Sequence, residues 1–209
     1  MEHSKPHFAP QAARLAVLGG IFLLMTWLKT SAAELGAGAA MPSFSLTGSS
    51  GQAVSSDGFS GKRAVVVVFM DSHCTYGQAY QSRLIALQNT YGPQGVQFVL
   101  INPNATGGNA AEMKQQAAQQ SYPFPYLIDE TQSTARAFGA TRTPEVFVFG
   151  PDHRLVYRGQ IDDNTEEKMV RKHDLKMALD AALSGNSKAI ANPVTTPFGC
   201  TIKWQGATP

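Results

Sequence analysis

Two apolar runs in the middle of the chain flank a stretch of helical periodicity. Residues 64–70 (AVVVVFM) and 96–102 (VQFVLIN) show little polar alternation, which is typical of strands buried on both faces of a sheet. A helix is predicted between them from Cys74, and its apolar face recurs at helical spacing, at Tyr80, Leu84, Leu87 and Tyr91. This strand–helix–strand unit implies parallel pairing of the two strands with a right-handed crossover.

The rest of the chain predicts a mixed sheet flanked by helices. The further elements are a hairpin over 44–56, a loop over 103–109, a helix over 110–120, a strand over 125–129, a helix over 131–139, a hairpin of 145–150 with 155–161, and a helix over 165–185. The tail from Asn186 has prolines and no period, so we expect it to lie extended on the surface. The fold class is therefore α/β, with an N-terminal β-hairpin and an extended C-terminal tail.

The first 33 residues have the layout of an export signal. Lys5 and Arg14 precede an uncharged apolar run over 15–28, and Ser31-Ala32-Ala33 offers small residues for cleavage. Fourteen apolar residues are short for a membrane span, which needs about 20. We expect a cleaved signal over 1–33 and a periplasmic or otherwise extracytoplasmic protein, with an uncleaved membrane anchor as the alternative. The remaining chain then divides into one domain over 34–185 and a tail over 186–209.

The charge balance gives no indication of a nucleic-acid partner. The whole chain carries 17 Lys and Arg against 15 Asp and Glu, a formal net charge of +2. Residues 1–33 hold three of the cations and one of the anions, which leaves 14 of each in the rest. Two cysteines outside the cytoplasm can form a disulfide, because that environment is oxidising.

Four motifs in one order give the chain a specific resemblance. They are HCTY (73–76), YPFPYLIDE (122–130), YRGQIDD (157–163) and GCTIKW (199–204). From about Leu35 to Trp204 the chain resembles the thioredoxin-like redoxins of the alkyl hydroperoxide reductase/thiol-specific antioxidant group. It is most similar to the peroxiredoxin-like branch marked by HC-Pro-Tyr and a terminal GCSIKW. The resemblance implies a thioredoxin-like fold and thiol redox chemistry, with thiol or peroxide substrates, an external reductant and no cofactor.

Cys74 is the expected reactive thiol. A cysteine at a helix start faces backbone N–H groups and the positive end of the helix dipole, which favour the thiolate. We expect this helix start to lie at the surface. Gly77 occupies the position where a Cys-x-x-Cys dithiol needs its second cysteine. Val67 and Asp71 stand where typical peroxiredoxins have proline and a hydroxyl residue, which puts peroxidase activity in doubt.

Other residues near Cys74 follow from the resemblance. Thr143-Pro144 matches the cis-proline that thioredoxin-like folds keep beside the active cysteine, where backbone can pair with an extended thiol substrate. Arg142 takes the place of a cysteine in the similar proteins, and it is either a thiolate-stabilising group or an ordinary surface residue. His73 is expected on the rim of the site, as a polar group or proton donor.

Cys200 is either an unpaired cysteine of the tail or the partner of Cys74, and we favour pairing. In a pair, Cys200 acts as a resolving thiol or as a fixed tether, and Ile202 and Trp204 are suited to anchor the tail. The sequence thus favours an exported peroxiredoxin-like thiol oxidoreductase with catalytic Cys74, Cys200 and Arg142. The alternative is a non-catalytic binding or assembly module of a protein complex. A copper carrier is disfavoured because a second nearby cysteine is absent, so no metal site is predicted.

Overall fold

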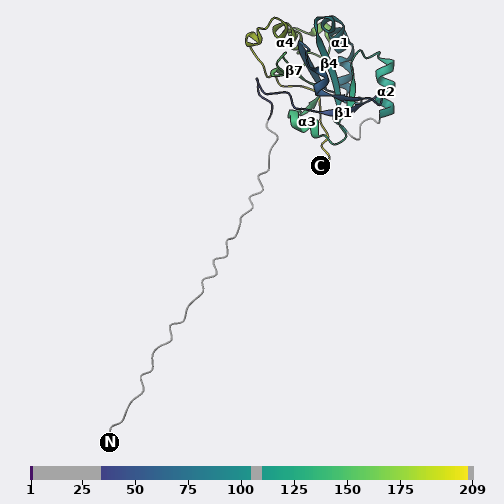
Figure 1. Ribbon diagram of the computed structural model, residues 1–209. Coiled ribbons are helices and arrows are strands. Elements are labelled where there is room, and N and C mark those ends of the chain that lie inside the picture. Colours follow the sequence, from purple (N-terminus) through teal and green to yellow (C-terminus); the bar gives the residue numbers. More distant parts are fainter. Residues whose placement is uncertain (2–33, 105–109, 207–209) are drawn as a thin grey trace. The chain divides into compact units, whose positions relative to one another are not determined.

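In the described part of the chain, Met1, 34–104 and 110–206, seven strands form one mixed sheet (Figure 1). The computed structural model places them in the order β2-β1-β5-β4-β3-β7-β8. β3, β4 and β5 pair in parallel, whereas the neighbours on either side pair antiparallel. The strands are β1 (Ser45–Gly48), β2 (Ala53–Ser55), β3 (Ala64–Phe69), β4 (Val96–Asn102), β5 (Tyr126–Ile128), β7 (Glu145–Phe149) and β8 (Leu155–Gly159).

Helices and a second, two-stranded pairing complete the described residues. The α-helices are α1 (Thr75–Tyr91), α2 (Ala110–Gln119), α3 (Ser133–Phe138) and α4 (Asp174–Leu183). The 3-10 turns are η1 (Ser56–Phe59), η2 (Gly92–Gln94), η3 (Glu167–Met169) and η4 (Ser187–Ala189). The short strands β6 (Arg142–Thr143) and β9 (Cys200–Thr201) pair with each other. This order confirms the predicted α/β arrangement, with its N-terminal hairpin and its parallel strand–helix–strand unit.

The central strand β3 is buried on both faces, as its apolar run predicts. Side chains alternate between the faces of a strand. Val66 and Val68 face a core that includes α1, α2 and α4. Val65, Val67 and Phe69 face the other core, where Phe138 of α3 lies. Helices therefore cover both faces of the sheet. Because β3 is packed on both sides, the turn that follows it is fixed in position.

The last helix is shorter than the sequence predicts. A helix over 165–185 is expected, but α4 begins at Asp174. The Asp163 carboxylate accepts hydrogen bonds from the backbone N–H groups of Arg171 (2.8 Å) and Lys172 (3.1 Å). Asn164 accepts another from the N–H of Glu166 at 2.9 Å. Side chains that bind nearby backbone donors compete with the helix, and here they keep the segment before α4 in a loop.

The tail is more integrated than an extended surface segment. It contains η4, and it then runs along β8, where the Arg158 N–H donates to the Pro193 carbonyl (2.9 Å) and the Thr195 N–H donates to the Arg158 carbonyl (3.0 Å). Ile202 is 2% exposed and belongs to the core around Phe138. The expected docking of Ile202 is therefore confirmed, and the tail is part of the fold.

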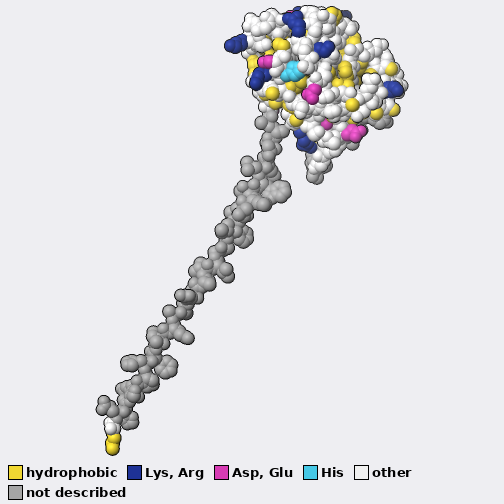
Figure 2. Space-filling model, in the orientation of Figure 1, with side chains coloured by type: hydrophobic (Ala, Val, Ile, Leu, Met, Phe, Trp, Pro, Cys, Tyr) yellow, Lys and Arg dark blue, Asp and Glu magenta, His cyan; other side chains and the backbone are white. Residues whose placement is uncertain are grey.

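Two further predictions concern the absence of a basic surface patch and the export signal at the N-terminus. On the face in Figure 2, Lys and Arg side chains stand apart from one another rather than in one patch. No helix among the described residues is both long and apolar enough to cross a membrane. The predicted export signal over 1–33 lies outside the described residues apart from Met1, as do residues 105–109 of the predicted 103–109 loop.

Candidate functional site

Cys74 lies between the fully buried strand β3 and the longest described helix, α1. It is the N-terminal cap of α1, with an extended backbone, and its carbonyl accepts the N–H of Gln78 at 2.9 Å. Its own N–H donates to the Asp71 carbonyl at 3.2 Å. The position at a helix start is as predicted. The surface location is not, because Cys74 is only 2% exposed.

Cys74 and Cys200 form a disulfide, with 5.9 Å between their Cα atoms. The predicted pairing of the two cysteines is confirmed, and the bond explains why Cys74 is covered. Cys200 is only partly buried, so the two sulfurs belong to residues of different accessibility. An incoming thiol has easier access to the Cys200 side of the bond.

The tail reaches Cys74 by pairing with the segment before Pro144. β6 and β9 are antiparallel, with Thr143 opposite Cys200 and Arg142 opposite Thr201. The Thr143–Pro144 peptide bond is cis, as the sequence predicts. A side chain on Gly199 would start 2.2 Å from the Thr143 carbonyl oxygen, so only glycine permits this approach of the backbones.

This arrangement agrees with the comparisons with known proteins. The profile of the Redoxin family matches residues 36–177, more than half of the chain. The chain belongs to the Redoxin family. Among curated proteins, none matches this Redoxin family member.

Solved structures support the same assignment. A conserved protein from Geobacillus kaustophilus, described as uncharacterized, is 35% identical, with a TM-score of 0.76 over 83% of this chain and 95% of that one. A hypothetical protein from Sinorhizobium meliloti 1021 is 30% identical, with a TM-score of 0.77 over 84% and 98%. A thiol:disulfide interchange protein from Bacteroides sp. is 17% identical, with a TM-score of 0.58 over 72% and 92%, and it shares the fold. The thioredoxin-like fold inferred from the four motifs is thus shown.

Two opposing influences act on the Cys74 sulfur of this Redoxin family member. The start of α1 favours a thiolate once the disulfide is reduced, by about 0.3–2 kcal/mol for a charge at a helix end. The sulfur also lies 3.0 Å from the Thr143 carbonyl oxygen. That oxygen is suited to accept a hydrogen bond from the thiol, and it repels the thiolate. Thr143 belongs to β6, so its carbonyl lies beside Cys74 independently of the tail.

Asp71, which departs from the usual peroxiredoxin pattern, is buried, and both of its carboxylate oxygens accept hydrogen bonds. It is 6% exposed. One oxygen accepts the backbone N–H of His73 at 2.9 Å, and the other accepts the side-chain amide of Asn104 at 2.5 Å. The structure therefore assigns Asp71 a bracing role in the turn before Cys74. The hydroxyl residue of typical peroxiredoxins is still missing here.

His73, which precedes Cys74 in the chain, is exposed. Its side chain is 60% exposed, 3.7 Å from the Asp71 carboxylate and 3.6 Å from that of Glu112. The Ser72 hydroxyl lies 3.3 Å from its Nδ1. These groups place the imidazole between two carboxylates.

Arg142 contacts the tail. Its guanidinium donates to the Gly199 carbonyl at 3.0 Å, one residue before Cys200. The structure thus brings together Cys74, Cys200, Thr143, Pro144 and Arg142, whereas the contacts of His73 are with Asp71, Ser72 and Glu112. The contact of Arg142 stabilises the position of Cys200, which the sequence does not indicate.

Two buried amides that the sequence does not single out hold the tail. Asn104, besides binding Asp71, accepts the N–H of Lys203 at 3.1 Å. Gln132 is fully buried and donates to the carbonyls of Pro103 and Lys203, both at 2.7 Å. Its oxygen accepts the N–H of Gln205, also at 2.7 Å. The two-residue strand β9 has few backbone hydrogen bonds, and the bonds from these amides hold the residues that follow it.

A buried ion pair supports the β6 side of the site. Glu145 is fully buried and accepts the N–H groups of Thr141 (2.8 Å) and Arg142 (3.3 Å). Its other oxygen accepts Nη2 of Arg158 at 2.9 Å. The carboxylate therefore fixes the backbone that enters β6. A fully buried acid just after Pro144 could have been suspected from its place at the start of an apolar strand.

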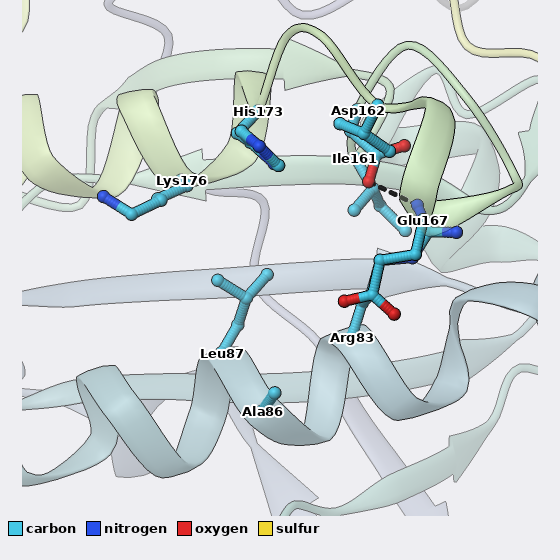
Figure 3. Close-up of a pocket in the computed structure, with 9 residues that line it drawn as sticks. Arg83, Ala86, Leu87, Ile161, Asp162, Glu167, His173 and Lys176 are labelled. Atoms are coloured by element: carbon cyan, nitrogen blue, oxygen red, sulfur yellow. Dashed lines mark hydrogen bonds and ion pairs between the residues drawn. The ribbon is translucent and has the colours of Figure 1, made fainter.

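A separate cavity lies between α1 and the loop before α4 (Figure 3). It has a volume of about 160 Å³. Arg83 of α1 pairs with Asp162 there, and Asp162 also accepts the Tyr80 hydroxyl at 2.9 Å. Burial, and then the neighbouring Asp162 carboxylate, raise the pKa of Tyr80. None of the predicted site residues lines this cavity, and among the described residues no group of three or more His, Cys, Asp or Glu could hold a metal ion.

Proposed function

We propose that this protein is an exported, peroxiredoxin-like thiol oxidoreductase in which Cys74 and Cys200 cycle between disulfide and dithiol. The observation that carries the proposal is the disulfide itself, which joins a cysteine at the start of α1 to a cysteine on a two-residue strand. A bond between a rigid element and a short, side-chain-anchored strand is suited to open and close without unfolding the sheet.

The reductive half of the cycle begins at Cys200, the less buried of the two residues. An external thiolate attacks Cys200, the disulfide breaks, and Cys74 leaves as a thiolate that the start of α1 stabilises. A second thiol resolves the mixed disulfide on Cys200. Two thiols are oxidised to one small disulfide, the protein disulfide is reduced, and the two thiol protons pass to solvent or to the protein cysteines.

The oxidative half has two candidate substrates of different chemistry. With a peroxide, the Cys74 thiolate attacks one oxygen, an alcohol or water leaves, and the sulfenic acid condenses with Cys200 to release water. With a disulfide substrate, Cys74 forms a mixed disulfide that Cys200 resolves. The replacement of the peroxide-binding residues by Val67 and Asp71 favours the disulfide substrate.

The test compares the two oxidants on the reduced protein. Reformation of the Cys74–Cys200 bond is followed by non-reducing peptide mapping after addition of hydrogen peroxide or of a small-molecule disulfide. Faster closure by the small disulfide supports exchange chemistry, and faster closure by peroxide supports a peroxidase. Intermolecular dimers, or over-oxidised Cys74 beside free Cys200, would reject the cycle.

The alternative function is a non-catalytic module with the disulfide as a permanent tether. The anchoring of the tail by Asn104 and Gln132 favours it, because these bonds oppose release of Cys200. The decisive measurement is reduction of the disulfide by thiols under native conditions. If the bond opens only together with global unfolding, it is a tether.

Export is part of the same proposal, and it rests on the charged, apolar and small-residue series of residues 1–33. The intact mass of protein recovered from its native host decides between a chain starting near Glu34 and one that keeps the leader. A retained leader would place the protein at a membrane instead.

A further inference from the structure

A second cavity lies between the tail and residues of β6 and β8, and Arg142 in its lining contacts the carbonyl of Gly199, next to Cys200. It has a volume of about 200 Å³, and Arg142 and Arg158 both line it. Tail residues 194–197 form its other side. The cavity is therefore closed by the same segment that leads to Cys200.

Arg158, which lines this cavity, has buried donors without an acceptor. Its side chain is 4% exposed, and only Nη2 is hydrogen-bonded, to Glu145 at 2.9 Å. Nε and Nη1 are buried and have no hydrogen-bond partner. Buried guanidinium donors normally find acceptors, so two that lack one point to a missing acceptor.

The carboxylate nearest to these donors is a poor fit. Glu34 lies 3.6 Å from Nη1 of Arg158, too far for a hydrogen bond, and its side chain is 68% exposed. Among the described residues that line the cavity, Glu34 is the one acid. Glu145 neutralises the charge of Arg158 through its bond to Nη2. The guanidinium of Arg142 donates to a backbone carbonyl, so its charge has no buried carboxylate as a partner.

We propose that this cavity binds the carboxylate of a small thiol, which displaces Glu34 and presents its sulfur to Cys200. Guanidinium groups form short, charge-assisted hydrogen bonds with carboxylates. The size also fits, because 200 Å³ corresponds to roughly six or seven waters at ~30 Å³ each, about the size of a three-carbon thiol acid. This assignment rests on the proposed function, of which it specifies the reductant.

The link to the disulfide runs through Arg142. Its guanidinium lines the cavity and also donates to the Gly199 carbonyl, next to Cys200. A carboxylate bound to Arg142 therefore competes with the bond that holds the tail. The bound thiolate attacks the Cys200 sulfur, the disulfide breaks, and Cys74 leaves as a thiolate. A second thiol then releases the small disulfide and the Cys200 thiolate.

The first test measures reduction of the disulfide in the full chain by two thiols of similar size. Rates with 3-mercaptopropionate and 2-mercaptoethanol are each divided by the rate of the same thiol with a small reference disulfide. We expect the corrected rates to favour the anionic thiol by roughly tenfold, the effect of one charge-assisted contact. Arg142→Gln should bring the ratio close to one, whereas Arg171→Gln, which removes an exposed arginine elsewhere, should keep it.

The second test uses propionate, which carries the carboxylate but no thiol. Binding is followed by the NMR signal of the Arg158 Nε–H group. Glu34→Gln should tighten propionate binding several-fold, because it removes the competing carboxylate, and Glu166→Gln should not. An unmoved Arg158 signal in Glu34→Gln, or a corrected rate ratio near one in the unaltered chain, would overturn the site.

The two tests separate this inference from the function on which it rests. Propionate binding with a disulfide that neither thiol reduces under native conditions would overturn both the cycle and the thiol ligand, and it would leave only a carboxylate site. Absent propionate binding with equal reduction by both thiols would overturn the site and leave the proposed cycle intact.

Discussion

The two cysteines of one disulfide are held by different kinds of structure. Cys74 connects a fully buried strand to α1, and backbone hydrogen bonds of the helix hold it. Cys200 lies on a strand of two residues, and side chains from distant parts of the chain hold the residues around it. Short elements with few backbone bonds open locally at low cost, whereas core strands open only with the whole fold. Cys74 thus belongs to the rigid part of the fold, whereas the segment around Cys200 can detach from β6 at a lower cost.

The largest expected effect comes from removing each cysteine in turn. Cys74→Ser should abolish thiol–disulfide exchange, because the leaving group at the start of α1 is lost. Cys200→Ser should keep an alkylatable Cys74 that forms mixed disulfides it cannot resolve. Alkylation mapping and exchange assays with a small disulfide measure both.

Both serine variants should also lose stability, by about 2–5 kcal/mol, since the bond closes a long loop. Chemical denaturation of the double variant is the control, because it should be no less stable than either single variant. Exchange that survives in Cys74→Ser would reverse the roles of the two residues.

The next effect sharpens the comparison on the β6 side. Glu145→Gln leaves Arg158 buried without its carboxylate, and removing one partner of a buried pair costs about 3–5 kcal/mol. Denaturant titration measures the loss. The matched control is Glu130→Gln, an exposed acid whose change should stay within about 0.5 kcal/mol. Equal stability of the two variants would show that the ion pair does not support β6.

The rigid half of the site could be predicted from sequence, and the reason is physical. An uninterrupted apolar run and a helical repeat fix the strand and the helix around Cys74, because burial of apolar surface dominates their placement. The four motifs then supplied the fold and the cis proline at Thr143–Pro144. Local patterns are sufficient where the structure depends on neighbours in the sequence.

The anchors of the tail could not be predicted in the same way. Gln132 and Lys203 are 71 residues apart, and the identity of neither residue predicts the hydrogen bond between them. The predicted start of the last helix, at residue 165, was wrong for a related reason, since α4 begins at Asp174. Glu166 and Glu167 resemble the acidic first turn of a helix, yet the side chain of Asp163 captures backbone donors that the helix would have used. Single hydrogen bonds between distant polar groups leave no periodic trace.

A smaller effect is expected from weakening one tail anchor. Gln132→Ala removes hydrogen bonds to the backbone of Pro103, Lys203 and Gln205, and it leaves buried groups unpaired at about 1–3 kcal/mol. In the reduced protein, hydrogen exchange at the Ile202 N–H, which bonds the Thr141 carbonyl, should accelerate.

Exchange in α1 of the same variant should stay unchanged, because the hydrogen bonds of the Gln132 side chain go to Pro103, Lys203 and Gln205 and none of them reaches α1. Gln119→Ala, an exposed change at the end of α2, serves as the control and should alter neither region. Equal acceleration in α1 and β9 would mean that the two halves of the site open together, against the contrast drawn between the cysteines.

The smallest effect concerns pH and the loop before α4. Backbone N–H groups of Arg171 and Lys172 hold the pKa of Asp163 below its usual range. Since the folded pKa is the lower one, this stabilisation is present above the ordinary value of about 4 and is lost as pH falls through the folded pKa. The protection of the Arg171 and Lys172 amides, measured as hydrogen exchange relative to the intrinsic rate at each pH, should therefore fall in acid, and Asp163→Asn should remove the dependence. A parallel change at Ile202 would contradict the independence of loop and tail.

The stacking of Arg136 on Trp204 gives the molecule an optical reporter. The guanidinium carbon lies 4.4 Å from the centre of the indole ring, in the tail just beyond Ile202. The chain has two tryptophans, Trp27 and Trp204, and a chain that starts near Glu34 keeps only the second. Its fluorescence then comes from a single indole, whose emission shifts to longer wavelength when the ring leaves a packed site for water. The position of the tail can therefore be followed in real time, without any label, while the disulfide opens and closes.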